Sequence, residues 1–566
     1  MRTTRLKICA FLLLCFSIVN ANAISPVFKW AKSFGGYDND YFTSFAIDDA
    51  DNVYLTGIYM LTMEFGAGNE SFDLTSNGKF DFFVAKLDKD GNLLWTKSYG
   101  GIFNEYSHKI LLDNEGNVYI IGTFNDDVNF GTDENPHELN SSFGQNIFIL
   151  KLDPDGNFIW VKQLAGQADK HIFSVTYDDA YNLIMTGTFN GEFDFDPGPD
   201  EYIVKSEKSY NNFVAKWNQD FEVQWVKQLE LDFTSNNTIA TDSKNNIYLS
   251  GVFKGKVDFD PNLETFYLES GSMYNTYLLK LDASGDFEYA KSLYSEDLNS
   301  SFDMVIDSDD NLLLAGYFDG STDFDPGDNE LLKSSRGQRD IFVSKLTSGG
   351  ELIWVQTWGG AGNEFAQVIT TDEFDNIYVA GVFNNSLSFE ATGRHDLNTV
   401  MGGNSMFNLV MYSNGNIMWT SYVESTNSIL PRGILIDSEW NIVTAGYYQG
   451  KTDFDPGENK FELEPLLFTD VFVQKVSQTT LSVLESNFGF DIGIFPNPMT
   501  DFVTLEFENV FESCEVKIIT LTGEEVFSGD YYHSKSIIMN LDVPPGFYLM
   551  ILESDNKKAV LKLMKN

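Results

Sequence analysis

The chain has 566 residues and a mass of 63.9 kDa, and its 83 acidic residues against 37 basic ones give a formal charge of -46 at pH 7. This charge excludes a nucleic-acid-binding protein, because a phosphate backbone demands clustered Lys and Arg side chains. Apolar residues make up 43% of the chain and aromatic residues 15%, which excludes a disordered acidic chain and supplies a large core.

The first 23 residues predict a secretory signal peptide. Three basic residues precede an apolar run over residues 8–19, and the small-x-small pattern Ala21-Asn22-Ala23 follows it. A membrane anchor is the alternative, but about a dozen apolar residues are too few for a bilayer core that needs roughly 20. Removal of residues 1–23 leaves 34 basic against 83 acidic residues, a charge of -49, with Cys514 as the single cysteine. We therefore expect an exported protein without disulfides and without a transmembrane segment in the mature chain.

The following 450 residues or so repeat with a period of about 65 residues, a pattern typical of a repeat architecture. Three marks recur seven times: an aromatic residue, a glycine, and an Asp followed four residues later by Asn. The aromatic residues are Trp30, Trp95, Trp160, Trp225, Tyr289, Trp354 and Trp419. The glycines are Gly57, Gly122, Gly187, Gly251, Gly316, Gly381 and Gly446. The Asp residues are Asp48, Asp113, Asp178, Asp242, Asp307, Asp372 and Asp437.

Each period predicts four short strands. In the second period, residues 93–99, 108–113, 117–124 and 146–153 are rich in β-branched and aromatic residues. Residues 113–117 and 153–157, which contain Asp, Gly and Asn, predict hairpin turns between them. Four strands repeated seven times are typical of a β-propeller.

The two ends of the repeat region complement each other. In the seventh period the slot of the recurring Trp falls on Leu484, outside any strand pattern, whereas Trp30 stands before the first complete period. We therefore expect the segment 27–34 to complete the last blade and to close the ring, because an open array would leave a sheet edge exposed. The predicted fold is all-β: a seven-bladed propeller over residues 24–480, closed by its N-terminal strand and followed by a second, smaller domain.

The repeats resemble a known family. The pattern D-x-x-x-N-[VI]-Y-x-x-G, the segment F-[VI]-x-K-L-D and the ending W-x-x-x-x-G-G are similar to the bacterial β-propeller repeats often labelled SBBP, over residues 27–476. The resemblance implies the propeller fold and little about activity, because propellers host many unrelated functions.

A predicted linker, residues 481–493, leads to a C-terminal domain over residues 494–566. Short strand patterns at 502–507, 516–520, 537–541 and 547–552, separated by turns, predict a small β-sandwich. Its Phe-Pro-Asn-Pro opening (495–498), Leu-Thr-Gly (521–523), Pro-Gly-Phe-Tyr (545–548) and Lys-rich end resemble the type A C-terminal sorting domain of the type IX (Por) secretion system. The resemblance implies Sec export, guidance through the outer membrane by the secretion machinery, and removal of the domain on release or attachment. An adhesive domain that stays on the mature protein is the alternative.

No catalytic motif stands out, and the five His residues form no close metal-ligand pair. One recurring acidic motif, D-F-D-P, occupies the same slot in four periods. Two Asp side chains two residues apart on an extended segment point to the same side, so they are candidate Ca²⁺ ligands, helped by Asp200, Asp328 or Glu458. The alternative is a turn in which Pro fixes φ and Asp caps the backbone. The candidate calcium ligands are Asp194, Asp196, Asp258, Asp260, Asp323, Asp325, Asp453 and Asp455.

Two other recurring residues have structural interpretations. We expect each recurring Lys to pack its stem on a neighbouring aromatic ring and to pair with an acid, although Val410 fills the sixth slot. We expect the recurring Trp to form contacts between blades rather than a sugar-stacking platform. The Lys residues are Lys86, Lys151, Lys216, Lys280, Lys345 and Lys475.

Even repetition favours a secreted or cell-surface binding or scaffold protein whose partner is a protein or a glycan. We expect that partner across the face of the propeller or at the mouth of its channel, where the loops 35–41, 100–106 and 359–365 gather. Two alternatives stay open: a carbohydrate-active hydrolase or lyase on the same scaffold, and a structural spacer.

Overall fold

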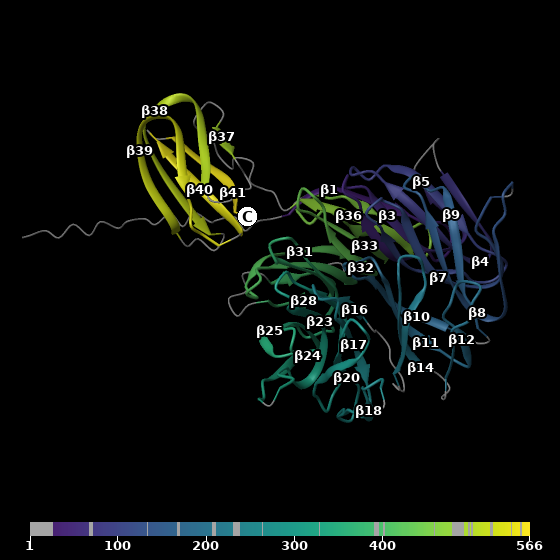
Figure 1. Cartoon of the computed structure of the whole chain (residues 1–566). Coiled ribbons are helices and arrows are strands. Elements are labelled where there is room, and N and C mark those ends of the chain that lie inside the picture. The colour runs from purple at the N-terminus through teal and green to yellow at the C-terminus, as the bar shows by residue number, and fades with distance from the viewer. Residues whose placement is uncertain are drawn as a thin grey trace, which may run out of the picture. The chain divides into compact units, whose positions relative to one another are not determined.

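The structure is a computed structural model. It describes residues 26–66, 72–132, 134–166, 170–206, 211–229, 238–262, 264–327, 329–389, 396–399, 402–457, 459–477, 492–495, 499, 502–520, 525–544, 546–554 and 557–565. The predicted signal peptide lies outside the described residues, as does most of the predicted linker. The chain divides into two compact units, a large unit of Pro26–Thr480 and a C-terminal unit that contains Leu481–Asn566. Every regular element in the described part is a β-strand (Figure 1).

In its described residues, the large unit contains five four-stranded antiparallel sheets and one ten-stranded sheet, besides short two-stranded pairs. The ten-stranded sheet holds two further sets of four antiparallel strands, joined by a single parallel bridge between Asn404 and Ser428. The seven sets are here called repeats 1 to 7. Repeats 1 to 3 are β2 (Tyr41–Ile47), β3 (Val53–Phe65), β4 (Phe72–Leu87) and β5 (Leu93–Tyr99); β6 (Tyr106–Leu112), β7 (Val118–Asn129), β8 (Glu138–Leu152) and β9 (Phe158–Leu164); β10 (Lys170–Tyr177), β11 (Leu183–Phe189), β14 (Asn211–Trp217) and β15 (Val223–Leu229). Repeats 4 and 5 are β16 (Thr238–Thr241), β17 (Ile247–Phe253), β20 (Asn275–Leu281) and β21 (Phe287–Leu293); β22 (Asn299–Ile306), β23 (Leu312–Asp323), β24 (Leu332–Leu346) and β25 (Leu352–Trp358). Repeats 6 and 7 are β26 (Phe365–Thr371), β27 (Ile377–Asn384), β30 (Asn404–Met411) and β31 (Ile417–Ser425); β32 (Ser428–Ile436), β33 (Asn441–Gln449), β36 (Asp470–Ser477) and β1 (Val27–Phe34).

The second and third strands of each repeat continue into a hairpin, here called the arm. In repeats 1, 2 and 5 the arm belongs to the long strands themselves, so those strands run past the ends that the sequence predicts. In the other repeats the arm is a separate short pair. These pairs are β12 (Glu192–Asp194) with β13 (Ile203–Lys205), β18 (Lys256–Asp258) with β19 (Tyr267–Glu269), β28 (Ser386–Leu387) with β29 (Leu397–Asn398), and β34 (Thr452–Asp453) with β35 (Glu462–Leu463).

The antiparallel order gives the large unit two faces. The arms and the loops that enter each repeat lie at one end of the strands, here called the loop face. The Asp-x-x-x-Asn turns lie at the other end, the turn face. In the first of these turns, the Asp48 carboxylate accepts hydrogen bonds from the backbone N–H groups of Ala50 and Asn52, and Asn52 donates its side-chain amide to the same carboxylate. This geometry explains why Asp and Asn recur at that spacing.

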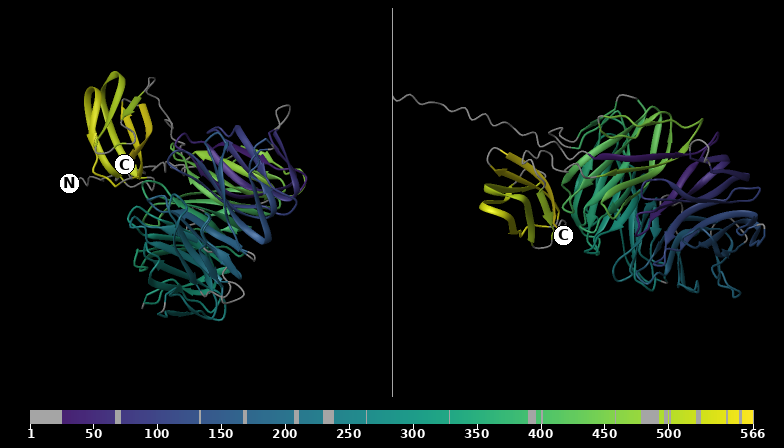
Figure 2. Two further views of the ribbon diagram at one scale, coloured as in Figure 1. Left: turned by 45° about the vertical axis from the view of Figure 1, so that its right-hand side comes forward. Right: turned by 90° about the horizontal axis from the view of Figure 1, so that it is seen from above.

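The N-terminal strand lies in the last repeat. β1 pairs antiparallel with β36, with Trp30 opposite Lys475 and Ser33 opposite Phe472 (Figure 1). The purple N-terminal segment and the green repeat 7 lie side by side in the views of Figure 2 as well. Strand pairing therefore joins residues more than 400 positions apart.

Repeat 7 contacts repeat 1 as repeat 1 contacts repeat 2. The indole of Trp30 donates to the Lys89 carbonyl oxygen at 3.2 Å, and Trp95 donates to the Pro154 carbonyl oxygen of the next repeat at the same distance. Lys475 Nζ also donates to the Lys89 oxygen, at 3.2 Å. The arrangement of the sheets is propeller-like.

The core lies between neighbouring sheets. One cluster combines Phe42 and Leu55 of repeat 1 with Val443 and Val471 of repeat 7. The recurring glycine of the second strand permits close packing there: a Cβ on Gly57 would lie 2.2 Å from the Tyr41 carbonyl oxygen and 2.7 Å from the Phe83 ring. This contact explains the glycine at that slot.

The C-terminal unit has one five-stranded sheet in its described residues, formed by β37 (Ile492–Phe495), β38 (Phe502–Thr520), β39 (Glu525–Asn540), β40 (Gly546–Ser554) and β41 (Lys557–Lys565). The expectation of separate strands at 502–507 and 516–520 is wrong, because β38 runs through both and only shifts register between Glu506 and Phe511. The Lys-rich end forms a strand, β41, that pairs with β40. Cys514 is buried in the core of this unit, and burial raises the pKa of its thiol to about 11.

In the part of the chain that the structure describes, no helix is long and apolar enough to cross a membrane.

Candidate functional site

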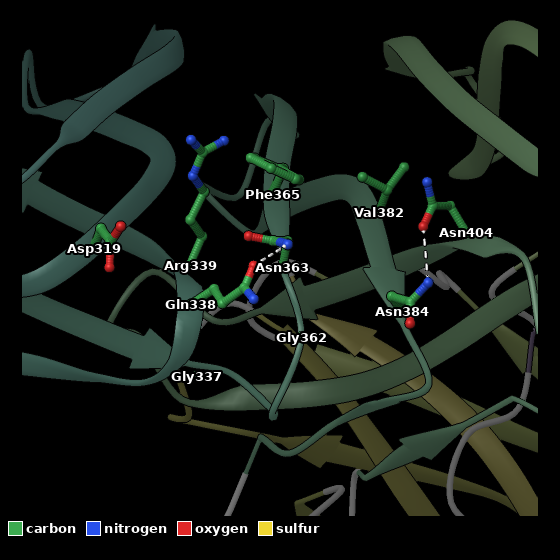
Figure 3. Close-up of a pocket in the computed structure, with 10 residues that line it drawn as sticks. All are labelled: Asp319, Gly337, Gln338, Arg339, Gly362, Asn363, Phe365, Val382, Asn384 and Asn404. Carbon is green, nitrogen blue, oxygen red and sulfur yellow. Dashed lines mark hydrogen bonds between the residues drawn. The ribbon is translucent and has the colours of Figure 1, made fainter.

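A pocket of about 900 Å³ opens between repeats 5 and 6 on the loop face (Figure 3). Its residues come from the arm of repeat 5, from the loop 359–365 and from the second and third strands of repeat 6. That loop is one of the three that the sequence places at the binding face. The lining residues are Asp319, Gly337, Gln338, Arg339, Gly362, Asn363, Phe365, Val382, Asn384 and Asn404.

Arg339 is held in this pocket by aromatic rings. Its guanidinium carbon lies 5.0 Å from the centroid of Tyr317 and 5.6 Å from that of Phe365, and the two rings meet edge to face at 5.0 Å. In Figure 3 the Phe365 ring lies beside the extended Arg339 side chain. Cation–π contacts orient a guanidinium without neutralising its charge, so its N–H groups remain donors for a ligand.

Amide side chains form the rest of the polar lining. Asn363 donates to Gln338 at 2.8 Å and Asn384 donates to Asn404 at 3.1 Å (Figure 3). Each amide carries two donors and an acceptor with two lone pairs, so one bond leaves capacity for a ligand. Rings beside amide groups match a ligand that carries hydroxyl groups on an apolar frame.

A second cavity, of about 440 Å³, lies along the first strands of all seven repeats. It is the channel of the large unit, and most of its lining is apolar or carries hydroxyl groups. Its ionisable side chains are His108, Lys109, Asp303 and Arg432.

Desolvation controls the charges in the channel. Burial raises the pKa of Asp303, although the backbone N–H groups of Ile369 and Met304 donate to its carboxylate at 3.0 and 2.9 Å and Lys109 attracts it. Burial lowers the pKa of Lys109, against the attraction of Asp303. Burial, with the charge of His171, lowers the pKa of His108 to about 4. The channel therefore favours neutral groups.

An aromatic contact connects the pocket with the channel. Phe302 lines the channel, and its ring lies 6.2 Å from that of the pocket residue Phe365. Elsewhere beside the channel, Arg432 stacks over Tyr447 at 5.8 Å and Tyr447 meets Tyr41 edge to face at 5.1 Å. An arginine therefore stacks on an aromatic ring at two places near the channel, Arg339 in the pocket and Arg432 beside Tyr447.

The candidate calcium ligands lie in the arms of repeats 3, 4, 5 and 7, where they cap the backbone. Asp323 Oδ1 accepts hydrogen bonds from the N–H groups of Asp325 (3.1 Å) and Leu331 (2.8 Å), and Asp325 Oδ1 accepts one from Gly327 (2.9 Å). The same three bonds occur in the other motifs, which contain Asp194 and Asp196, Asp258 and Asp260, and Asp453 and Asp455. The turn interpretation accounts for these contacts.

The Phe within the motif recurs in all seven repeats, including the three that lack D-F-D-P. Each of these rings is at most 3% exposed and packs between sheets. Asn129 replaces the capping Asp in repeat 2, where it accepts from Gly131 and His137. The seven residues are Phe65, Phe130, Phe195, Phe259, Phe324, Phe389 and Phe454.

The calcium hypothesis stays a prediction. In the described residues no group of three or more His, Cys, Asp or Glu side chains is placed to hold a metal ion. Asp200 is exposed, whereas Asp328 and Glu458 lie outside the described residues.

The recurring Lys side chains pair with acids and stack on rings, as expected. Lys216, Lys345 and Lys475 lie 2.8, 2.6 and 2.5 Å from the turn acids of their own repeats. Lys86 lies 4.6 Å from the centroid of Tyr54. Lys280 differs, since its acid partner is Glu288 on the fourth strand.

The recurring Trp forms contacts between repeats, as the sequence predicts. Six of the seven rings pack against a turn of the following repeat, and the turn that would face the seventh, Trp419, lies outside the described residues. A Cβ on Gly91, whose φ is +79°, would lie 2.9 Å from the Trp30 ring. In repeat 3 the counterpart of this glycine is Phe221, whose ring meets that of Trp160 of repeat 2 edge to face at 5.1 Å.

The sequence analysis named the loop 359–365, which contains Gly362, Asn363 and Phe365, but it missed Arg339 and the other pocket residues. The counterparts of Arg339 are Phe80, Gln145, Tyr210, Tyr274, Asn404 and Thr469. A comparison of the seven repeats column by column isolates Arg339, but it does not show that Asn363 and Phe365 lie beside it.

Comparisons with known proteins support export. Residues 493–566 match the family model described as secretion system C-terminal sorting domain. This match supports sorting of the chain by the type IX machinery across the outer membrane to the cell surface or the extracellular space.

The repeats have remote relatives. The chain is 23% identical over 474 residues to an uncharacterized WD repeat-containing protein, L264, of Acanthamoeba polyphaga mimivirus, an alignment that covers 69% of this chain and 34% of that protein. The chain thus spans about a third of the length of this curated relative.

Solved structures with some likeness include the extracellular domain of a putative hybrid two-component system from B. thetaiotaomicron (10% identity, 95% of this chain and 100% of that chain, TM-score 0.17). Others are a protein of unknown function from Dyadobacter fermentans (10%, 64% and 94%, TM-score 0.31) and a member of the duf4221 family from Bacteroides vulgatus (8%, 63% and 92%, TM-score 0.28).

Proposed function

We propose that this exported protein is a seven-bladed β-propeller that binds a neutral oligosaccharide on its loop face, with the pocket between repeats 5 and 6 as the site. The observation that carries this proposal is the group of Arg339, the Tyr317 and Phe365 rings, and the four amides of Gln338, Asn363, Asn384 and Asn404. Among the residues that the structure describes, this combination lies between repeats 5 and 6 and does not follow the repeat.

The charge of the protein favours a neutral ligand. At a net charge of -49 after signal removal, the long-range field repels a polyanionic glycan. Asp319 is the one carboxylate among the described residues that line the pocket. Glycoside hydrolysis by the common mechanism requires a pair of carboxylates, so binding fits the site better than catalysis does.

The finer features of the architecture belong to the same proposal. The seven repeats are the blades, β1 closes the ring, and the repeats are of the SBBP type. Residues 1–23 are a signal peptide, the propeller spans residues 24–480, and residues 494–566 form the sandwich that engages the secretion machinery.

A glycan-array screen of the purified chain, residues 24–566, tests the proposed function. We expect binding to a restricted set of neutral oligosaccharides, a loss of at least tenfold in affinity in Arg339→Ala and Phe365→Ala, and full binding in Arg336→Ala, which changes an exposed arginine outside the pocket lining. Equal binding by all three variants would contradict the proposed site, and cleavage of the bound glycan would establish the hydrolase or lyase alternative.

A further inference from the structure

Three pairs of buried carboxyl groups lie between neighbouring repeats on the loop face, and the proposed binding function does not use them. Each pair joins an acid at the end of an entering loop, the loop acid, to an Asp in the third strand of the preceding repeat, the strand acid. These carboxyl pairs are Asp40 with Asp470, Glu105 with Asp81, and Glu364 with Asp340.

The backbone holds the three carboxyl pairs in one geometry. The N–H group of each loop acid donates to the carbonyl oxygen of the residue before the strand acid, at 2.8 Å in all three: Asp40 to Thr469, Glu105 to Phe80, and Glu364 to Arg339.

Two successive glycines support this geometry. In the loop that enters repeat 1, a Cβ on Gly35 would lie 2.2 Å from Asp470 Oδ1, and the N–H group of Gly36 donates to the Asp40 carboxylate at 2.7 Å. Gly100 with Gly101, and Gly359 with Gly360, repeat both contacts. This explains the double glycine in the W-x-x-x-x-G-G pattern.

In the described part of the chain, each carboxyl pair contains at least one buried oxygen that has no hydrogen-bond donor. Asp40, Asp81, Glu105 and Glu364 are 0% exposed and Asp470 is 5% exposed. Within the described residues, each of these five carboxyl groups has one oxygen without a hydrogen-bond partner. A buried oxygen of this kind demands a donor.

The other repeats show what the position requires, because the loop and strand residues change together. In the loop that enters repeat 3 the loop residue is Lys170 and the strand residue is Asn146, and Lys170 Nζ donates to Asn146 Oδ1 at 3.0 Å.

In the loop that enters repeat 5 both residues are amides, and Asn275 donates its side-chain N–H to the carbonyl oxygens of Ser295 (2.9 Å) and Asp297 (3.3 Å). Wherever the loop residue is an acid, the strand residue is an acid too. In the loops that enter repeats 3 and 5, an ammonium or an amide group donates the hydrogen bond. In the loop that enters repeat 7, the two residues are Ile429 and Ser405.

We propose that each carboxyl pair holds one proton at neutral pH, and that these protons hold neighbouring repeats together on the loop face. One proton supplies the missing donor and removes one of two like charges from a buried site. A metal ion is a poorer fit, since two carboxylates fall short of the six to eight oxygens that Ca²⁺ takes.

The surrounding charges keep the proton bound. Burial, aided by the charges of Asp470 and Asp38, raises the pKa of Asp40 to about 8, and burial raises that of Asp470 to about 6, with Glu64 adding to the rise. Burial, aided by Asp81 and Asp126, raises the pKa of Glu105 to about 7.

The third pair follows the same rule. Burial and the charge of Asp340 raise the pKa of Glu364 to about 7. Burial also raises the pKa of Asp340, with Asp319 adding to the rise and Arg336 opposing it. The charged groups that act on the carboxyl pairs are thus carboxylates, apart from Arg336. The neutral hydroxyl groups of four tyrosines also lie close to them: Tyr41, Tyr59, Tyr106 and Tyr448.

The sign of the pH effect follows. The folded-state pKa values lie above the ordinary values of 3.8 and 4.5, so between them the folded protein binds more protons than the unfolded chain. Stability therefore falls as pH rises from about 4, where the carboxyl groups of the unfolded chain ionise, to about 8, and it levels off above that range. Each carboxyl pair increases the unfolding constant by up to about tenfold per pH unit within it.

The melting temperature of the whole protein from pH 6 to pH 9 tests the proposal. We expect the melting temperature of the wild type to fall up to about pH 8 and then to level off, and we expect proton release when the protein unfolds at pH 7. Most exposed carboxylates are already ionised over this range, so they contribute little.

A triple variant copies the Asn of other repeats: Asp81→Asn, Asp340→Asn and Asp470→Asn. Its melting temperature should fall much less with pH than that of the wild type and should be higher than that of the wild type at pH 9. The charge-matched variant Asp49→Asn, Asp220→Asn and Asp309→Asn changes exposed turn residues and should keep the wild-type profile.

A wild-type melting temperature that stays constant from pH 6 to 9, or no proton release, overturns the proposal without any variant. A triple variant that keeps the fall also overturns it. If Ca²⁺ raises the melting temperature of the wild type at pH 9 but not that of the triple variant, a metal ion rather than a proton occupies the carboxyl pairs.

Discussion

The Lys and Asp pairs of the turn face permit a sharp comparison between repeats. In repeat 3, Lys216 Nζ lies 2.8 Å from Asp178 Oδ2, and the two side chains are 9% and 1% exposed. The other side-chain donor to this oxygen is Asn182, at 2.8 Å. In repeat 1, Lys86 is farther from Asp48, at 3.6 Å, and the Tyr54 hydroxyl also donates to that carboxylate, at 3.2 Å.

We predict that Lys216→Val lowers the free energy of unfolding by about 3 kcal/mol, because it leaves a buried carboxylate without its cation. Lys86→Val should lower it by about 1 kcal/mol, since Tyr54 and Asn52 continue to donate to Asp48. Valine fits the slot, because Val410 occupies it in repeat 6, where Tyr378 donates to Asp372 at 2.8 Å.

Urea unfolding followed by circular dichroism measures both differences at pH 7. The double variant Lys216→Val and Ile184→Tyr, which introduces the hydroxyl of repeat 6, should recover part of the loss. If Lys86→Val destabilises the protein as much as Lys216→Val, or more, the reasoning about donors to the turn acid is wrong.

Three further predictions concern the arms and export. Phe324→Ala should lower stability by about 3 to 5 kcal/mol through the cavity it leaves, and a loss near zero in thermal unfolding would contradict its core role. Asp323→Ala should lower the free energy of unfolding by about 1 to 2 kcal/mol, because Asp323 caps the turn. Calorimetric titration with Ca²⁺ distinguishes the turn from a calcium site: binding heat in the wild type that this variant loses would show that the motif binds Ca²⁺. Deletion of residues 494–566 should retain the protein inside the cell, and its normal appearance at the surface or in the medium would refute the sorting assignment.

The repeat region could be read from the sequence because packing demands the same residue at the same slot. Trp30 and its counterparts pack on turns, and Gly57 and its counterparts lie against a carbonyl oxygen. Both requirements recur with every repeat, so they leave a period in the sequence. The ends of β4 and β8 could not be predicted, because the arms are partly exposed and lack a clear apolar alternation.

The sites were harder to predict because they depend on tertiary contacts. Asp40 and Asp470 are 430 positions apart, and nothing in either segment indicates the other. The D-F-D-P motif drew attention to carboxylates that cap turns. The buried acids Asp40, Glu105 and Glu364 lie in the loops 35–41, 100–106 and 359–365, which the sequence analysis associated only with ligand binding. In β38 the sequence predicted a break, but the strand continues through a register shift.

Closure of the ring by the N-terminal strand is the central claim, and a disulfide tests it most directly. Val27 of β1 lies opposite Ser477 of β36 in the antiparallel ladder, where Cα atoms are about 4.5 to 5.5 Å apart and within reach of a disulfide. In a Cys514→Ala background, Val27→Cys with Ser477→Cys should oxidise completely and raise the melting temperature, while each single cysteine variant stays monomeric and unlinked. Free thiols at both positions under oxidising conditions would contradict the closed ring.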